Sequence, residues 1–244
     1  MTESLNWNGF VHIALPQKDC RKQEKLFVNK MSLGAGICVS RKIIYPLTVE
    51  KKEVVIMDLK NQMVEFMNQV SNGNIEIYNE FSIQFELAIF LRANLPKEYK
   101  IQLERNINYF GLRKEVLLKK EMDIVVFNHF TNEKHCIEIK YPTNGQYPEQ
   151  MFSICKDIKF LEQLVDSNFS TAYCLVVVND PLFYNNKGDD GIYRLFRKEK
   201  LLRGSIQKPT GKKDIVYQLN NEYKIEWIGT SGTQKYFIAK VERK

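Results

Sequence analysis

The stretch KKEMDIVVFNHFTNEKHCIEIKY, residues 119–141, decides the fold, because it holds two strand-like runs joined by a short polar turn. Neighbouring residues of a strand point to opposite faces of its sheet. Glu138 and Lys140 therefore share one face, and the apolar residues around them share the other. Charged side chains in such a setting rarely lack a partner or a chemical role. This pair is therefore the first candidate for a functional site.

The segments around this hairpin predict a regular order of elements. An apolar spacing of three to four residues predicts a helix that ends before Pro96, with Ser82 as its cap, and a second helix that Pro148 opens. Alternating or continuous apolar runs predict the strands. The predicted order is helix, strands at 99–107, 119–130 and 135–141, helix, and a strand at 171–180. The last strand needs the second helix as a crossover, so we expect an α/β protein with a small mixed sheet and helices on its faces.

We expect three regions along the chain. A core spans 75–180, an N-terminal appendage of mixed structure spans 1–74, and a basic C-terminal appendage spans 181–244 and ends in a hairpin turning at 229–232. Short strands are predicted at 9–15, 36–49 and 53–59, and an amphipathic helix at 59–70. The stretch 194–213 holds eight Lys or Arg against one Glu. Tyr193, Phe196 and Trp227 lie near it in sequence and could stack on bases.

Composition and charge restrict the class of protein. With 44% hydrophobic residues the chain can form a core, and a net charge of +7 favours a polyanionic partner such as nucleic acid. The five cysteines form no CxxC pair and the three histidines no metal spacing, which predicts a reducing compartment and no zinc. We read His129 and His135, which flank the hairpin turn, as surface residues. No secretory leader and no apolar run long enough to span a membrane is present, so a cytoplasmic protein is expected.

Asp123 adds a second carboxylate to the candidate site. If the two runs pair as a hairpin, Asp123 and Glu138 can meet Lys140 at one edge of the sheet. Two carboxylates on rigid strands suit Mg²⁺, and the backbone carbonyl of Ile139 could complete the protein ligands. Lys140 would then orient or deprotonate a metal-bound water for attack on phosphorus. Glu121 shares the face of Asp123 and is the alternative ligand.

An Asp followed on the next strand by Glu-x-Lys, between a Glu-bearing helix and a second helix, resembles the PD-(D/E)xK nuclease superfamily over residues 80–178. The resemblance implies a restriction-endonuclease-like αβββαβ core and a Mg²⁺- or Mn²⁺-dependent endonuclease that cuts DNA. It assigns Asp123 and Glu138 as the acids and Lys140 as the lysine of the motif. Glu86 matches the acid on the preceding helix, with Glu80 as the alternative.

The resemblance extends to the helix after the motif. Gln150 is similar to a glutamine that some branches of the superfamily place beside the site, although Ile154 stands where those branches carry a Tyr. Lys156 and Lys159 on the same helix could contact a phosphate backbone.

The resemblance also implies candidate partners and roles. It implies a restriction or phage-defence role, a homodimer, and a regulatory or defence-system partner protein. An RNA-processing nuclease and a catalytically inactive nucleic-acid-binding module of the same fold remain the alternatives.

Overall fold

The computed structural model describes residues 58–185, 190–211 and 214–243. The chain divides into the units Met1–Val54 and Val55–Lys244, and every described residue belongs to the second. The strands expected at 9–15 and 36–49 lie outside the described residues. Of the strand expected at 53–59, only Asp58 and Leu59 are described, and they begin a helix instead.

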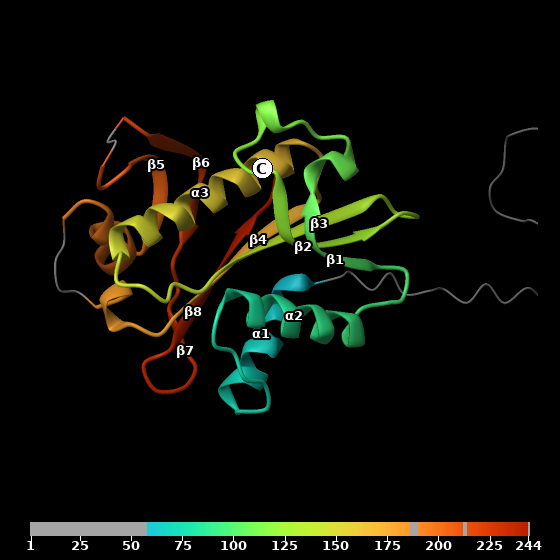
Figure 1. Ribbon diagram of the computed structural model, residues 1–244, viewed down its shortest axis with the longest axis horizontal. Coiled ribbons are helices and arrows are strands. Elements are labelled where there is room, and N and C mark those ends of the chain that lie inside the picture. Colours follow the sequence, from blue (N-terminus) through green and yellow to red (C-terminus); the bar gives the residue numbers. More distant parts are fainter. Residues whose placement is uncertain (1–57, 186–189, 212–213, 244) are drawn as a thin grey trace, which may run out of the picture. The chain divides into compact units, whose positions relative to one another are not determined.

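Six strands form a mixed sheet at the centre of the second unit (Figure 1). The strands are β1 (Lys100–Asn106), β2 (Glu121–Asn128), β3 (Glu133–Lys140), β4 (Thr171–Val178), β7 (Ile228–Gly229) and β8 (Lys235–Val241). Across the sheet they follow the order β1-β2-β3-β4-β8-β7. Only β3 and β4 pair in parallel, and all other neighbours are antiparallel. The predicted α/β class with a mixed sheet is confirmed.

Helices cover both faces of this sheet. The long helices are α1 (Leu59–Ser71), α2 (Glu80–Asn94) and α3 (Tyr147–Asp166), and α3 is the crossover that joins β3 to the parallel β4. Short helical turns are η1 (Ile107–Phe110), η2 (Lys114–Val116), η3 (Pro181–Phe183) and the π-helical η4 (Arg194–Glu199). No helix in the described part of the chain is long and apolar enough to cross a lipid bilayer.

Strand alternation divides the core into two clusters. Val125 and Cys136 pack with α3 on one face, whereas Ile124 and Ile137 pack with α1 and α2 on the other. Figure 1 shows the sheet between these two layers. Cys136, Cys155 and Cys174 are buried and form no disulfide. The predicted helix at 59–70 corresponds to α1, whose buried side chains contribute to the second cluster.

A capping box begins α2. The side chain of Asn79 is the N-cap and accepts a hydrogen bond from the backbone N–H of Ser82, and the Ser82 hydroxyl accepts one from the N–H of Asn79. The expectation that Ser82 itself caps the helix is therefore wrong by three residues. Ser82 instead fills the third helical position, where it satisfies a second free N–H group of the helix start.

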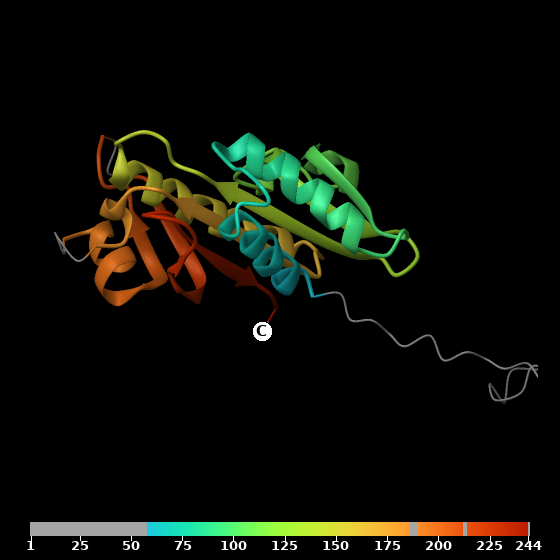
Figure 2. The ribbon, with the colours of Figure 1, turned by 90° about the horizontal axis from the view of Figure 1, so that it is seen from below.

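The C-terminal region is built into the same unit as the core. β8 pairs with β4 along its whole length, so the expected boundary at residue 180 does not separate an appendage from the sheet. The predicted terminal hairpin is present as β7 and β8. A second hairpin, β5 (Leu201–Gln207) with β6 (Val216–Lys224), lies beside α3 (Figure 2).

One buried carboxylate fixes the β5–β6 hairpin to α3. Glu162 accepts hydrogen bonds from the backbone N–H groups of Asn220 and Asn221 at 2.8 and 3.0 Å and from the Tyr223 hydroxyl at 2.8 Å. Lys159 completes this contact with an ion pair to Glu162 at 3.1 Å. These contacts tie β6 to the helix that also carries part of the candidate site.

His135, expected at the surface, and Phe196, considered for base stacking, are both buried. His135 is 6% exposed because strand alternation places it on the same face as Ile137, which is the face that α1 and α2 cover. Phe196 is fully buried, so the base-stacking role expected for it is wrong. Trp227 packs edge-on against Phe237. Tyr193 lies over the guanidinium of Arg197, at 3.8 Å.

The burial of His135 predicts an acid sensitivity of the fold. Burial lowers the pKa of His135 to about 4, although the negative charge of Glu133 acts to raise it. Between pH 6.5 and 4 the unfolded chain binds a proton that the folded chain excludes, so the free energy of unfolding falls as the pH falls, by up to about 3 kcal/mol. We expect His135→Gln to remove most of this loss in urea denaturation. His129→Gln, at an exposed position, should follow the wild-type pH profile, and equal profiles for both variants would contradict the assignment.

Candidate functional site

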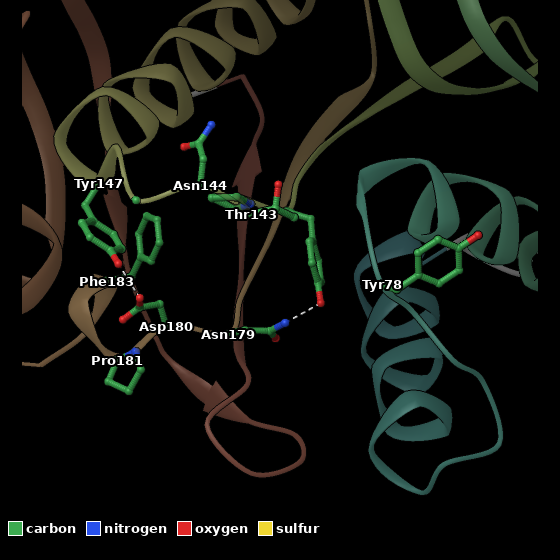
Figure 3. Close-up of a pocket in the computed structure, with 11 residues that line it drawn as sticks. Tyr78, Thr143, Asn144, Tyr147, Asn179, Asp180, Pro181 and Phe183 are labelled. Atoms are coloured by element: carbon green, nitrogen blue, oxygen red, sulfur yellow. Dashed lines mark hydrogen bonds between the residues drawn. The ribbon is translucent and has the colours of Figure 1, made fainter.

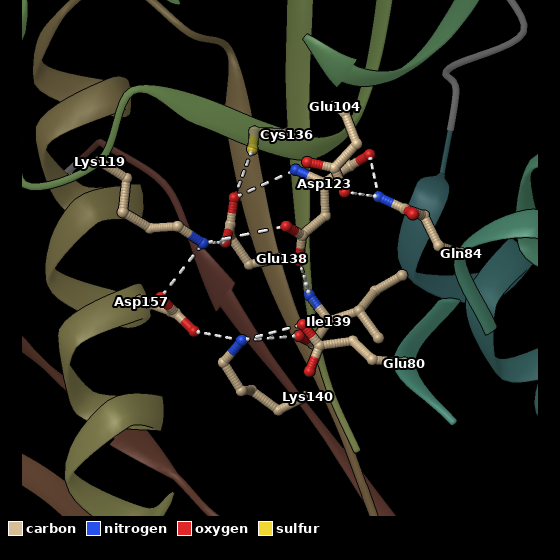
Figure 4. Close-up of polar contacts among 10 residues, drawn as sticks. All are labelled: Glu80, Gln84, Glu104, Lys119, Asp123, Cys136, Glu138, Ile139, Lys140 and Asp157. Carbon is tan, nitrogen blue, oxygen red and sulfur yellow. Dashed lines mark hydrogen bonds and ion pairs between the residues drawn. The ribbon is translucent and has the colours of Figure 1, made fainter. Parts of the chain in front are cut away.

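The candidate site lies where β2 and β3 separate. The two strands pair from Asn128 and Glu133 as far as Ile124 and Ile137, and then their ladder stops. Beyond this point β3 continues along β4, and β2 continues along β1. In place of a backbone partner, the N–H of Ile139 donates to the carboxylate of Asp123 at 2.8 Å (Figure 4). The separation leaves room for side chains between the strands and α3.

The structure brings Asp123, Glu138 and Lys140 together in this gap. Glu138 is fully buried, and the side chains of Asp123 and Lys140 are each 13% exposed. Glu138 accepts a hydrogen bond from the backbone N–H of Asp123 at 3.4 Å. The carbonyl of Ile139 accepts one from the ammonium of Lys140 at 3.1 Å. The oxygens proposed from sequence as metal ligands therefore belong to one connected cluster.

Two residues that the sequence analysis did not select complete the cluster. Lys119, just before β2, places its ammonium against the carboxylate of Glu138 and at 3.4 Å from Asp157 on α3. It also lies 3.9 Å from a carboxylate oxygen of Asp123. Asp157 forms a second ion pair, with Lys140 at 3.0 Å, although its side chain is only 3% exposed. Lys119 and Asp157 thus connect the strand residues to helix α3 (Figure 4).

Helix α2 contributes Glu80 to the cluster. Its carboxylate lies 3.2 Å from the ammonium of Lys140. Glu86 lies six residues further along the helix, about 120° around its axis from Glu80. Within the described residues no hydrogen bond or ion pair joins Glu86 to the cluster, so the structure favours Glu80, the alternative left open by the sequence. Gln84, buried one turn after Glu80, instead donates to the backbone carbonyl of Asp123 at 2.7 Å.

The burial of these charges shifts their pKa values. Burial raises the pKa of Asp123 to about 6, against the lowering effect of the Lys119 charge. Burial also raises the pKa of Glu138 well above its usual range, and the nearby carboxylates of Asp123 and Asp157 add to the shift. For Lys119 and Lys140 burial acts to lower the pKa, but the surrounding carboxylates outweigh it and raise both values. Both lysines therefore remain charged. A further cation beside the carboxylates would favour the ionised forms of Asp123 and Glu138.

The donor chemistry of the cluster suits a hard divalent cation. Asp123, Glu138 and the carbonyl of Ile139 offer oxygen atoms from two rigid strands, as Mg²⁺ requires. These oxygens are engaged by Lys119, Lys140 and backbone N–H groups. Among residues 58–185, 190–211 and 214–243, no set of three or more His, Cys, Asp or Glu side chains is arranged to hold a metal ion. A cation at Asp123 and Glu138 would therefore have to share oxygens with an ammonium group or replace it.

A groove runs beside the cluster at the end of β3. One pocket of about 370 Å³ includes Glu80, Phe81 and Gln150 in its lining. It shares the loop 141–144 with a second pocket of about 490 Å³, whose aromatic walls include Tyr78 and Tyr147 (Figure 3). The loop follows Lys140 directly in sequence. The pockets therefore lie next to the charged cluster, with Glu80 common to both the cluster and the smaller pocket.

The remaining predicted residues of α3 lie in different surroundings. Gln150 lines the smaller pocket and donates to Asn144 at 3.0 Å. Lys156 is half-buried. The ammonium of Lys159 is held by Glu162 and by Asn220 at 3.0 Å, so Lys159 helps to dock β6 rather than presenting a free charge. Glu121, the alternative ligand, is exposed.

Comparison with protein-family models, with curated proteins and with solved structures found no significant match to this chain. The interpretation of the cluster therefore depends on its own geometry and on the sequence motif.

The position of Asp157 predicts that it stabilises the metal-free fold. Replacing it with Asn keeps the shape but removes the charge that faces both lysines. Lys119 and Lys140 keep other carboxylate partners, so we expect a loss of about 2 to 3 kcal/mol, below the roughly 3–5 kcal/mol for a buried charge left without any partner. Urea denaturation at pH 7 in EDTA measures the loss. Asp166→Asn, at an exposed position of the same helix, should change stability little, and equal effects of the two variants would contradict the assignment.

Proposed function

We propose that the protein is a metal-dependent nuclease with a restriction-endonuclease-like core, which hydrolyses phosphodiester bonds of DNA with Mg²⁺ or Mn²⁺. The observation that carries the proposal is the meeting of Asp123, Glu138 and Lys140 where β2 and β3 separate. These residues occur in the order of the nuclease motif, on the strands where the resemblance requires them. The cluster also accounts for charged side chains at poorly exposed positions of β2 and β3, since each has an oppositely charged partner there.

The cluster provides a separate role for each residue. Asp123, Glu138 and the carbonyl of Ile139 would hold the ion, which supplies an activated water and charge neutralisation at the phosphate. Lys140 keeps its proton, because the surrounding carboxylates raise its pKa. An ammonium at this position would donate hydrogen bonds to the water or to the phosphate oxygens. Glu80 and Asp157 fix the position of the Lys140 ammonium from two sides.

The groove beside the cluster supports a nucleic-acid substrate. Tyr78 and Tyr147 lie in the lining of the larger pocket, where aromatic rings could stack on bases flanking the cleaved bond. Gln150 and Phe81 line the part that adjoins Glu80. The net charge of +7 favours a polyanion over a neutral substrate. We infer that the strand to be cut enters along this groove and reaches the cluster at Lys140.

A second candidate function is a nucleic-acid-binding module of the same fold that does not cleave. The observation in its favour is that ammonium groups already engage the ligand oxygens of Glu138 and Ile139. In such a module the two lysines would replace the metal permanently. Cleavage assays separate the two candidates, and RNA among the substrates tests the RNA-processing alternative.

The biological setting that we propose is restriction or phage defence, with a homodimer and a regulatory partner protein as further components. This part of the proposal depends on analogy between proteins of one fold and not on residues of this chain.

The nuclease proposal predicts metal-dependent cleavage of DNA. Purified protein should cut plasmid DNA in the presence of Mg²⁺ or Mn²⁺ and leave it intact in EDTA, as gel electrophoresis would show. Single-stranded DNA and structured RNA serve as parallel substrates. Products that persist in EDTA would contradict the metal mechanism. Binding without cleavage of any substrate would favour the inactive module.

The role of Lys140 predicts a separation of cleavage from binding. Lys140→Ala should lower the cleavage rate at least about 100-fold, because the group that positions the water is lost. DNA affinity should change by no more than about threefold, since one mostly buried lysine adds little to counter-ion release. Single-turnover kinetics and a fluorescence binding assay measure the two effects.

Lys224→Ala removes an equal charge from an exposed position on β6 and serves as the matched control. It should retain wild-type cleavage. Full activity of Lys140→Ala would show that the site is wrongly assigned.

A further inference from the structure

The backbone on both sides of Lys119 is fixed. The N–H of Leu118 donates to the side chain of Gln163 on α3 at 2.9 Å, and that side chain donates in turn to the carbonyl of Val116 at 3.3 Å. On the other side, the carbonyl of Lys120 accepts a hydrogen bond from the N–H of Ile107 at 2.9 Å. The approach of Lys119 to the cluster is therefore set by the fold, and its side chain alone is left to move.

The ammonium of Lys119 lies among three carboxylates. It contacts Glu138 directly and also lies within ion-pair distance of Asp123 and Asp157. Two of these three, Asp123 and Glu138, are the carboxylates that the proposed nuclease would use to hold its metal. A divalent ion bound to the same Glu138 oxygen would overlap the ammonium, and the two positive charges would repel each other.

The side chain of Lys119 has a route out of the cluster. It is 22% exposed, whereas Glu138 is fully buried, so the lysine reaches the site from the solvent side. A rotation of its flexible side chain would carry the ammonium into water without moving β2. The buried carboxylate cannot move in the same way, because it belongs to a central strand.

We propose that Lys119 is the resident cation of the metal-free site, and that a divalent metal ion must displace its ammonium from Asp123 and Glu138. This inference rests on the proposed function, since it concerns the same metal. Metal binding is then an exchange of cations: one ammonium leaves to solvent as one divalent ion enters. Lys119 stabilises the empty site and lowers its apparent affinity for metal.

Mn²⁺ binding tests the exchange without an activity measurement. Isothermal titration of DNA-free protein compares the wild type with Lys119→Met, which keeps most of the length of the side chain and removes its charge. We expect Lys119→Met to bind Mn²⁺ at least tenfold more tightly and to melt at a lower temperature than the wild type in EDTA. Lys120→Met, a change of the adjacent exposed lysine, should leave both values unchanged. Equal or weaker Mn²⁺ binding by Lys119→Met would overturn the inference.

A measurement on the wild-type protein covers the case in which Lys119→Met fails to fold. Reductive methylation followed by peptide mass spectrometry reports which lysine amines are accessible. We expect Lys119 to be protected in EDTA and to be labelled several-fold faster with saturating Mn²⁺, while Lys120 reacts at the same rate in both. Equal labelling of Lys119 under the two conditions would overturn the inference.

The outcomes distinguish this inference from the nuclease proposal. Cleavage that requires metal, together with unchanged metal affinity of Lys119→Met and unchanged labelling, rejects the exchange alone. Absence of Mn²⁺ binding by both the wild type and Lys119→Met rejects the exchange together with the metal-dependent function.

Discussion

A fully buried carboxylate on a central strand, that of Glu138, is the constraint from which the arrangement of the site follows. An ionised carboxylate without partners is very costly in such surroundings. Lys119 supplies the opposite charge and the backbone of Asp123 supplies a hydrogen bond. Asp157 in turn balances Lys119 and Lys140 from α3. Lys119, which lies before β2, and Asp157, on the buried face of α3, thus belong to the same charged cluster as Glu138.

The charged cluster occupies the gap where β2 and β3 separate. A continuous ladder would have closed the gap beyond Ile124 and Ile137 with backbone hydrogen bonds. Instead the Asp123 carboxylate takes the N–H of Ile139, and the gap opens beside the groove at the end of β3. Rigid strands therefore hold charged groups against a solvent-accessible hollow. This combination suits catalysis on a polyanion, because charges placed in advance need little rearrangement when charge develops on the substrate.

The sequence predicted the strands of the sheet, and it predicted that Glu138 and Lys140 lie on one face of their strand. Both predictions succeed because the alternation of side chains along a strand is a local property. Asp157 was missed although it falls between Ile154 and Leu161 on the buried stripe of α3, where a charged residue is itself a signal. Lys119 carries no such signal, since it lies just before β2 and two of its three carboxylate partners, Glu138 and Asp157, are distant in sequence. His135 was predicted at the surface because it is close to the turn in sequence. It is buried because strand alternation places it on the same face as Ile137. The pairing of β8 with β4 depends on contacts between distant segments and has no local signature.

The proposed site requires the oxygens of Asp123 and Glu138 to be ligands of a divalent ion and not only partners of lysine. Anomalous X-ray scattering from crystals grown with saturating Mn²⁺ tests this most directly. We predict one strong anomalous peak between these two carboxylates, within coordination distance of an oxygen of each, with the Lys119 ammonium turned toward solvent. A map without that peak, in which Lys119 still contacts Glu138, would contradict it.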